Sequence, residues 1–167
     1  MTAPQTGPVH VSPVQIGPLE IGPLQIGPLQ SADRAGWEPL ARGYKAFYRT
    51  EVSDAGYEQT WQRLLSGGAV KGLAARRGGQ LLGIAHYYFH DTVWASDACY
   101  LQDLYVDEVA RGQGIAAALI EHLAAIARAQ GASRFYWTTQ QDNARARALY
   151  DRVAQWHGFI RYDVAMS

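Results

Sequence analysis

The sequence predicts an α/β fold with a mixed, mostly antiparallel central sheet, a parallel strand pair and flanking helices. Amphipathic segments at helical spacing alternate with short segments rich in β-branched and aromatic residues. The early strands follow one another through a tight turn at Arg77-Gly78-Gly79, so they should pair antiparallel. A later strand–helix–strand unit over residues 99–138 should cross over right-handed, which makes its two strands parallel.

Composition limits the classes of protein that this chain can belong to. The chain has 167 residues, of which 48% are apolar and 11% aromatic, which suits one domain with a packed core. Fifteen Lys and Arg balance fifteen Asp and Glu, which argues against a nucleic-acid partner. No apolar run is long enough for a membrane span, no secretory signal is visible, and Cys99 is the only cysteine. We therefore expect a cytoplasmic protein without a nucleic-acid or membrane partner.

Residues 6–30 form five pentads of related sequence, ending with Ile26-Gly27-Pro28-Leu29-Gln30, and hold five of the seven prolines. A proline in every pentad forbids a long helix and favours extended backbone. The pentads are either a tail of limited order or a segment whose Ile and Leu side chains lie along a groove or a partner subunit. We divide the chain into a Gly/Pro pentad extension, residues 1–23, and a domain over residues 24–167.

The first half of the domain should contain two helices and three strands. Asp33 can cap a helix whose apolar residues recur at intervals of three and four, namely Trp37, Leu40, Tyr44, Phe47 and Tyr48. A short second helix should cover residues 57–65. Residues 69–75 and 80–89 look like a hairpin, and residues 99–106 like the next strand.

The second half should alternate helices and strands. Residues 114–130 carry apolar side chains at helical spacing, and Gly131 stands where that helix should stop. A strand is predicted over residues 134–138 and a helix over residues 143–153. Residues 159–164 should close the chain as a last strand.

A glycine-rich turn, Arg111-Gly112-Gln113-Gly114-Ile115-Ala116, joins the strand that ends at Val106 to the helix that follows. Glycine permits a tight turn, and the first amides of a helix have no partner within it, so this turn can bind an anion such as a phosphate. Two common nucleotide motifs are absent: there is no phosphate-binding loop ending in Gly-Lys-Ser/Thr, and Ala117 stands where a dinucleotide motif needs its third glycine.

These residues resemble the GCN5-related N-acetyltransferase (GNAT) superfamily, over about residues 24–165. The turn and the strand before it, Tyr100 to Asp107, are similar to the acetyl-CoA signature of that family. The run Asn143-Ala144-Arg145-Ala146-Arg147-Ala148-Leu149-Tyr150 resembles its Asn-x-x-Ala-x-x-x-Tyr helix, and Gly158-Phe159 its closing Gly-Phe. Among branches, the chain is most similar to the histone/polyamine acetyltransferases.

The resemblance implies acetyl-CoA as cosubstrate and a set of residues that bind it, with no metal. The backbone of Leu104, Tyr105 and Val106 would pair with the pantetheine arm. The pyrophosphate would lie on the amides of Gly112, Gln113, Gly114, Ile115 and Ala116, with Arg111 beside them. Asn143 would bond the cofactor near the thioester, or cap its helix, or do both. Tyr150 would protonate the departing thiolate, since a phenol keeps its proton at neutral pH.

The reaction also needs a group that takes a proton from the attacking amine. By the resemblance, polyamine-acetylating members often have an acidic residue where this chain has Gln102. We favour Asp103 as the base, although it lies on the opposite face of its strand from Gln102 unless a bulge intervenes. Glu51, His86 and His90 are the other candidates. Cys99 is expected to be a packing residue.

The resemblance predicts an N-acetyltransferase that transfers an acetyl group directly to a primary amine: a polyamine, an amino acid or a lysine side chain, as a small molecule or within a peptide. We expect it to act as a homodimer. The alternative is a non-catalytic, acyl-CoA-binding regulatory domain, against which the presence of both Asn143 and Tyr150 argues. The aromatic residues of the first two helices, with Trp61 among them, either line an amine slot by cation–π contact or belong to the core.

Overall fold

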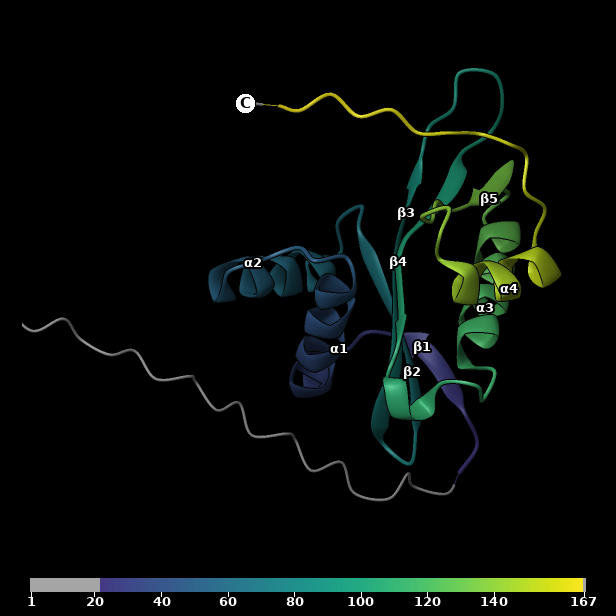
Figure 1. The fold of residues 1–167 in the computed structure, drawn as a ribbon. Coiled ribbons are helices and arrows are strands. Elements are labelled where there is room, and N and C mark those ends of the chain that lie inside the picture. The colour runs from purple at the N-terminus through teal and green to yellow at the C-terminus, as the bar shows by residue number, and fades with distance from the viewer. Residues whose placement is uncertain (1–21, 167) are drawn as a thin grey trace, which may run out of the picture.

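The computed structural model describes residues 22–166, which form one five-stranded sheet with helices on both faces (Figure 1). The strands lie in the order of the chain: β1 (Gln25–Pro28), β2 (Lys71–Arg77), β3 (Gln80–His90), β4 (Ala98–Val106) and β5 (Arg134–Tyr136). Strands β1 to β4 pair antiparallel, and β4 pairs with β5 in parallel. The predicted fold class is confirmed. The predictions for residues 1–21, most of the pentads, lie outside the described residues.

Two helices cover each face of the sheet (Figure 1). Helices α1 (Arg34–Phe47) and α2 (Asp54–Leu65) lie on one side, and α3 (Ile115–Ala129) and α4 (Ala144–Val153) lie on the other. Each face has its own core, one around Trp37 and Trp61 and the other around Leu119 and Leu123. No helix within residues 22–166 combines the length and the apolar character that crossing a membrane requires.

Asp33 lies at the N-cap of the first helix, as predicted, but its side chain does not bond the amides of that helix. A short 3-10 turn, η1 (Ser31–Asp33), precedes α1, and Asp33 makes no side-chain bond to the helix amides. Its carboxylate instead accepts hydrogen bonds from the Gln30 amide at 2.7 Å and from Arg76 of β2. Asp33 therefore ties the start of α1 to the sheet.

Strands β4 and β5 diverge, and β4 contains a bulge. The parallel pairing ends at Tyr100 and Tyr136, so no strand of the described residues 22–166 lies beside the edge of β4 from Leu101 to Val106. On its other edge β4 pairs with β3 along its length, with a shift of register at one point. His86 is opposite Asp103, but the next residue of β3, Tyr87, is opposite Leu101, so one residue of β4 has no partner there. Gln102 is the extra residue, so a bulge intervenes before Asp103.

The predicted last strand over residues 159–164 is not formed. After α4 the chain runs in extended conformation past β5 and across the end of β3 and β4 before it leaves the domain, as the yellow end in Figure 1 shows. It makes no main-chain hydrogen bond to the described part of the chain beyond the one from the Ala154 amide to Tyr150. A strand is stable only when a neighbour pairs with it, and residues 22–166 of this single chain supply none there.

Candidate active site

The glycine-rich turn leads from β4 through a second 3-10 turn, η2 (Glu108–Ala110), into α3. Gly112 and Gly114 have positive φ angles of 80° and 79°, which a side chain would strain, and an added Cβ would meet no atom within 4 Å. The Ala118 amide donates the first bond within the helix, to Gly114, and the amides before it as far as Gly112 donate to no main-chain acceptor among the described residues. The turn therefore offers free donors at the positive end of the α3 dipole.

Arg111 stabilises this turn by hydrogen bonds to the residues just before it. Its guanidinium donates to the Val106 carbonyl at 3.2 Å and to the Glu108 carboxylate at 2.9 Å, and it stacks over the ring of Tyr105. The positive charge therefore lies at the base of the turn, beside the amides.

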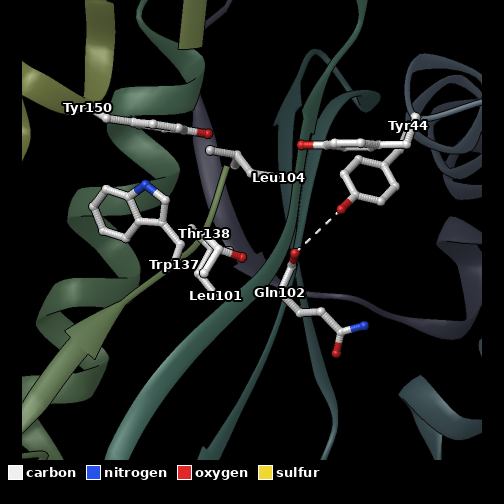
Figure 2. A pocket seen from close by; sticks show the side chains of 8 residues that line it. Tyr44, Leu101, Gln102, Leu104, Trp137, Thr138 and Tyr150 are labelled. Carbon is white, nitrogen blue, oxygen red and sulfur yellow. Dashed lines mark hydrogen bonds between the residues drawn. The ribbon is translucent and has the colours of Figure 1, made fainter. Parts of the chain in front are cut away.

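A small pocket opens where β4 leaves β5, and residues from both faces of the sheet line it (Figure 2). Tyr44 and Tyr48 come from the end of α1, and Tyr150 comes from α4. The others lie on β4 or follow β5, and the complete lining is Tyr44, Tyr48, Leu101, Gln102, Leu104, Trp137, Thr138 and Tyr150. The pocket lies beside the unpaired edge of β4, so main-chain groups of that strand are accessible from it.

Tyr150 enters the pocket from the side of α4. Figure 2 shows its hydroxyl directed over Leu104 toward β4. Its ring packs edge-to-face on Trp137, with 5.3 Å between the ring centroids. Burial raises the pKa of Tyr150 to about 12, and Tyr48 nearby adds to the shift. The hydroxyl is therefore protonated at neutral pH and directed into the pocket, as a proton donor must be.

Asn143 caps α4, because its Oδ1 accepts the Ala146 amide at 3.3 Å. Its Nδ2 donates to the Thr139 hydroxyl at 3.2 Å. This bond links the start of α4 to the segment that follows β5. The capping role expected for Asn143 is present.

Asp103 lies beneath the pocket rather than in its lining. The bulge at Gln102 turns Asp103 toward α1, where its Oδ2 is 2.9 Å from His86 Nδ1. The Tyr44 hydroxyl lies 3.4 Å from the Gln102 carbonyl oxygen, along the dashed line in Figure 2, and is near enough to the Asp103 carboxylate for each group to shift the pKa of the other. Tyr44 therefore connects Asp103 to the pocket.

The pKa of Asp103 is lowered, so this carboxylate is ionised at neutral pH. Burial acts to raise the pKa, but the hydrogen bond from His86, the nearby Tyr44 hydroxyl and the charge of Lys45 outweigh it. Burial also raises the pKa of Tyr44, and the negative charge of Asp103 raises it further. The pair is thus a neutral phenol beside a carboxylate.

The structure brings none of the other acid–base candidates into the pocket. Glu51 is exposed in the loop between α1 and α2. His90 lies at the far end of β3, where its Nε2 is 2.9 Å from the Tyr136 hydroxyl. Cys99 is buried in the core, and burial raises the pKa of its thiol to about 11, so it is a packing residue. Within residues 22–166, no three His, Cys, Asp or Glu side chains meet as metal ligands.

The aromatic residues of the first helices divide between core and pocket. Trp37 and Trp61 are buried, and Phe47 is half exposed outside the pocket. Only Tyr44 and Tyr48 line it. The sequence pattern also missed Trp137 and Thr138, because the chain leaves β5 two residues earlier than predicted, and these residues turn to the pocket instead of pairing.

A model of the acetyltransferase (GNAT) family matches residues 37–154. A curated relative is the D-amino-acid N-acetyltransferase HPA3 of Saccharomyces cerevisiae, 34% identical over 127 residues, which are 73% of this chain and 78% of the yeast protein. The thialysine N-epsilon-acetyltransferase of Sus scrofa is 32% identical over 91 residues, 50% of this chain and 54% of that relative.

Solved structures share the fold. The aminoglycoside acetyltransferase AAC(6')-Iy, whose structure is a complex with the bisubstrate analogue CoA-S-monomethyl-acetylneamine, superposes with a TM-score of 0.76. The match covers 86% of this chain and 99% of that one at 15% identity. At this identity the match shows the common fold.

Proposed function

Because the chain belongs to the acetyltransferase (GNAT) family and is an N-acetyltransferase, we propose that it moves the acetyl group of acetyl-CoA directly onto a primary amine. The observation that carries the proposal is the placement of the Tyr150 hydroxyl beside the unpaired edge of β4, the strand that leads to the free amides of the α3 turn. The proposed catalytic unit is residues 24–167, with the pentad extension outside it.

The residues present fit the cosubstrate. The amides from Gly112 to Ala116 can bind its pyrophosphate, and the main chain of Leu104 to Val106 offers donors and acceptors to an extended amide-containing arm. Gly112 and Gly114 leave the approach free of side chains. When bound, acetyl-CoA supplies an activated acetyl thioester and a thiol leaving group. Arg111 supports this site by holding the turn, and Asn143 by fixing the start of α4.

Tyr150 donates a proton from its hydroxyl to the sulfur that leaves as the amide bond forms. Its raised pKa keeps that proton in place at any physiological pH. The hydroxyl makes no hydrogen bond to another described side chain, so it is free to turn toward a bound group.

Asp103 acts on the amine as a fixed negative charge. A carboxylate whose pKa is lowered is a poor store for a proton at neutral pH, but it attracts an ammonium group and favours the positive charge that develops on nitrogen during attack. We therefore propose the expected base, Asp103, in this narrower role, acting through the Tyr44 hydroxyl. The proton leaves the nitrogen to solvent water, and solvent returns a proton to Tyr150 after the thiol departs.

A small cationic amine fits this pocket best. The lining on the amine side consists of the phenol rings of Tyr44 and Tyr48, and the charge behind them is negative. The yeast relative is named for D-amino acids and the pig relative for thialysine, both of which are amino acids. We propose a free amino acid or a short diamine as acceptor, with a lysine side chain in a peptide as the larger possibility.

Thiol release from acetyl-CoA, measured with a panel of amino acids, diamines and lysine peptides, tests the proposal. We expect amine-dependent thiol release together with a product whose mass is one acetyl group above that of the amine. Binding of CoA without turnover on any amine would instead support an acyl-CoA-binding regulatory domain. We place the reaction in the cytoplasm, where a single thiol such as Cys99 stays reduced.

We propose that the enzyme is a homodimer and that the segment after α4 pairs with a second copy. Residues 159–164 alternate in a strand pattern, and their large apolar side chains are exposed, Tyr162 to 87% and Val164 to 85%. The outer edge of β5 has no strand beside it among residues 22–166. One chain thus holds both an unpaired strand former and an unpaired sheet edge, which together suit exchange between two copies.

Removal of residues 155–167 should convert a dimer into a monomer, because it removes the proposed exchanged strand. Light scattering after size-exclusion chromatography measures the mass. Tyr162→Asp, on the apolar face of that segment, should weaken the dimer, and Asp163→Ala, on the opposite face, serves as its control. A shortened chain that stays dimeric would contradict the proposal.

A further inference from the structure

Three side chains from three elements form a hydrogen-bonded line beneath the pocket. Trp37 of α1 donates from its Nε1 to His86 Nε2 at 2.9 Å, and His86 Nδ1 lies 2.9 Å from Asp103 Oδ2. The indole is fully buried and the imidazole is 6% exposed. Neither lines the pocket. The proposed acetyl transfer leaves His86 and Trp37 without a role.

The indole determines which nitrogen of His86 carries the proton. An indole N–H can only donate, so His86 Nε2 must accept and cannot carry a hydrogen. The proton of the neutral imidazole is therefore on Nδ1, where it is donated to Asp103. The opposite tautomer would direct two N–H groups at each other and leave the carboxylate without a donor.

The surroundings hold this arrangement rigidly. Trp37 packs against Trp61 and Tyr57 of α2, with ring centroids 5.1 Å and 6.4 Å away. His86 and Asp103 are register partners across β3 and β4, at the step next to the bulge. The bulge that turns Asp103 toward α1 thus also places it opposite His86.

We propose that His86 is a positioning residue for acetyl transfer: Trp37 fixes its Nδ1–H tautomer, and His86 thereby holds the Asp103 carboxylate toward Tyr44 and the amine. We call the hydrogen-bonded line of Trp37, His86 and Asp103 the relay. Its purpose rests on the proposed function, whereas its geometry does not. A histidine that served only the core would need no particular tautomer and no carboxylate beside the pocket. The groups that face Asp103 are His86 on β3 and Tyr44, Lys45 and Tyr48 on α1.

The tautomer can be observed directly. In the full-length protein labelled with 15N-histidine, His86 should show a protonated Nδ1 and an unprotonated Nε2 near neutral pH. Trp37→Phe keeps an aromatic ring in the core but removes the donor, so this fixed pattern should be lost. A protonated Nε2 in the unmodified protein would overturn the proposal.

The effect on Asp103 separates positioning from packing. His86→Leu removes the donor, so the pKa of Asp103, followed by 13C NMR, should rise from its lowered value, and kcat should fall about tenfold. His86→Asn can still donate from an amide nitrogen close to the position of Nδ1. It should therefore restore most of the lowered pKa of Asp103 and most of kcat. An unchanged pKa of Asp103 or a wild-type kcat in His86→Leu would overturn the relay. Failure of the unmodified protein to acetylate any amine would overturn the proposed function alone, since the 15N and 13C measurements do not depend on turnover.

Discussion

Tyr150→Phe should lower kcat for acetyl transfer by more than about tenfold while the affinity for CoA stays near that of the unmodified protein. The substitution removes only the hydroxyl, which makes no hydrogen bond to another described side chain, and the ring keeps its edge-to-face contact with Trp137. The fold should therefore be unaffected. What is lost is the proton for the departing sulfur, because no other lining residue brings a hydroxyl over Leu104 from the side of α4.

The matched control is Tyr88→Phe, which removes a hydroxyl from a tyrosine outside the pocket, packed on Tyr100. The pH dependence provides a second check. Because the pKa of Tyr150 is raised to about 12, its deprotonation should cause no loss of activity in the unmodified enzyme below about pH 11. Equal kcat in Tyr150→Phe and Tyr88→Phe would remove the acid role.

Local patterns made most of the fold predictable. Helix α3 could be predicted from four apolar residues at helical spacing. Four of the five strands could be predicted from short segments of strand-forming residues between turn residues. The turn from Arg111 to Ala116 was visible because glycine with positive φ leaves a sequence signal. Tyr150 and Asn143 are candidates only through their resemblance to a family motif, since neither residue is distinctive alone.

The features that the sequence did not reveal depend on contacts between distant segments. Residues 159–164 do alternate as the residues of a strand do. Such alternation does not indicate whether the same chain supplies a partner strand. The bulge at Gln102 left the orientation of Asp103 open, because one extra residue reverses the face of every later side chain. The sequence gives no sign of the bonds of His86 to Trp37 and Asp103, because these bonds join residues up to 49 positions apart.

Asp103→Asn should lower kcat/KM for a cationic amine by more than about tenfold, corresponding to a loss of about 1.4 kcal/mol or more of transition-state stabilisation. The substitution removes the charge but keeps an oxygen that can accept the His86 Nδ1–H, so the relay and the core should survive. Asp97→Asn, an exposed carboxylate outside the pocket, is the control for the change in net charge.

The pH dependence of that loss distinguishes a fixed charge from a general base. The pKa of Asp103 is lowered in the folded protein, so the carboxylate is ionised above its ordinary value of 3.8 and protonates only as pH falls further. The ratio of the unmodified to the Asp103→Asn activity should therefore be constant from roughly pH 6 to 9. A titrating base with a pKa in that range would instead make the ratio rise with pH, because only the unmodified enzyme would gain activity on losing the proton. Such a rise would show that Asp103 itself accepts the proton of the amine.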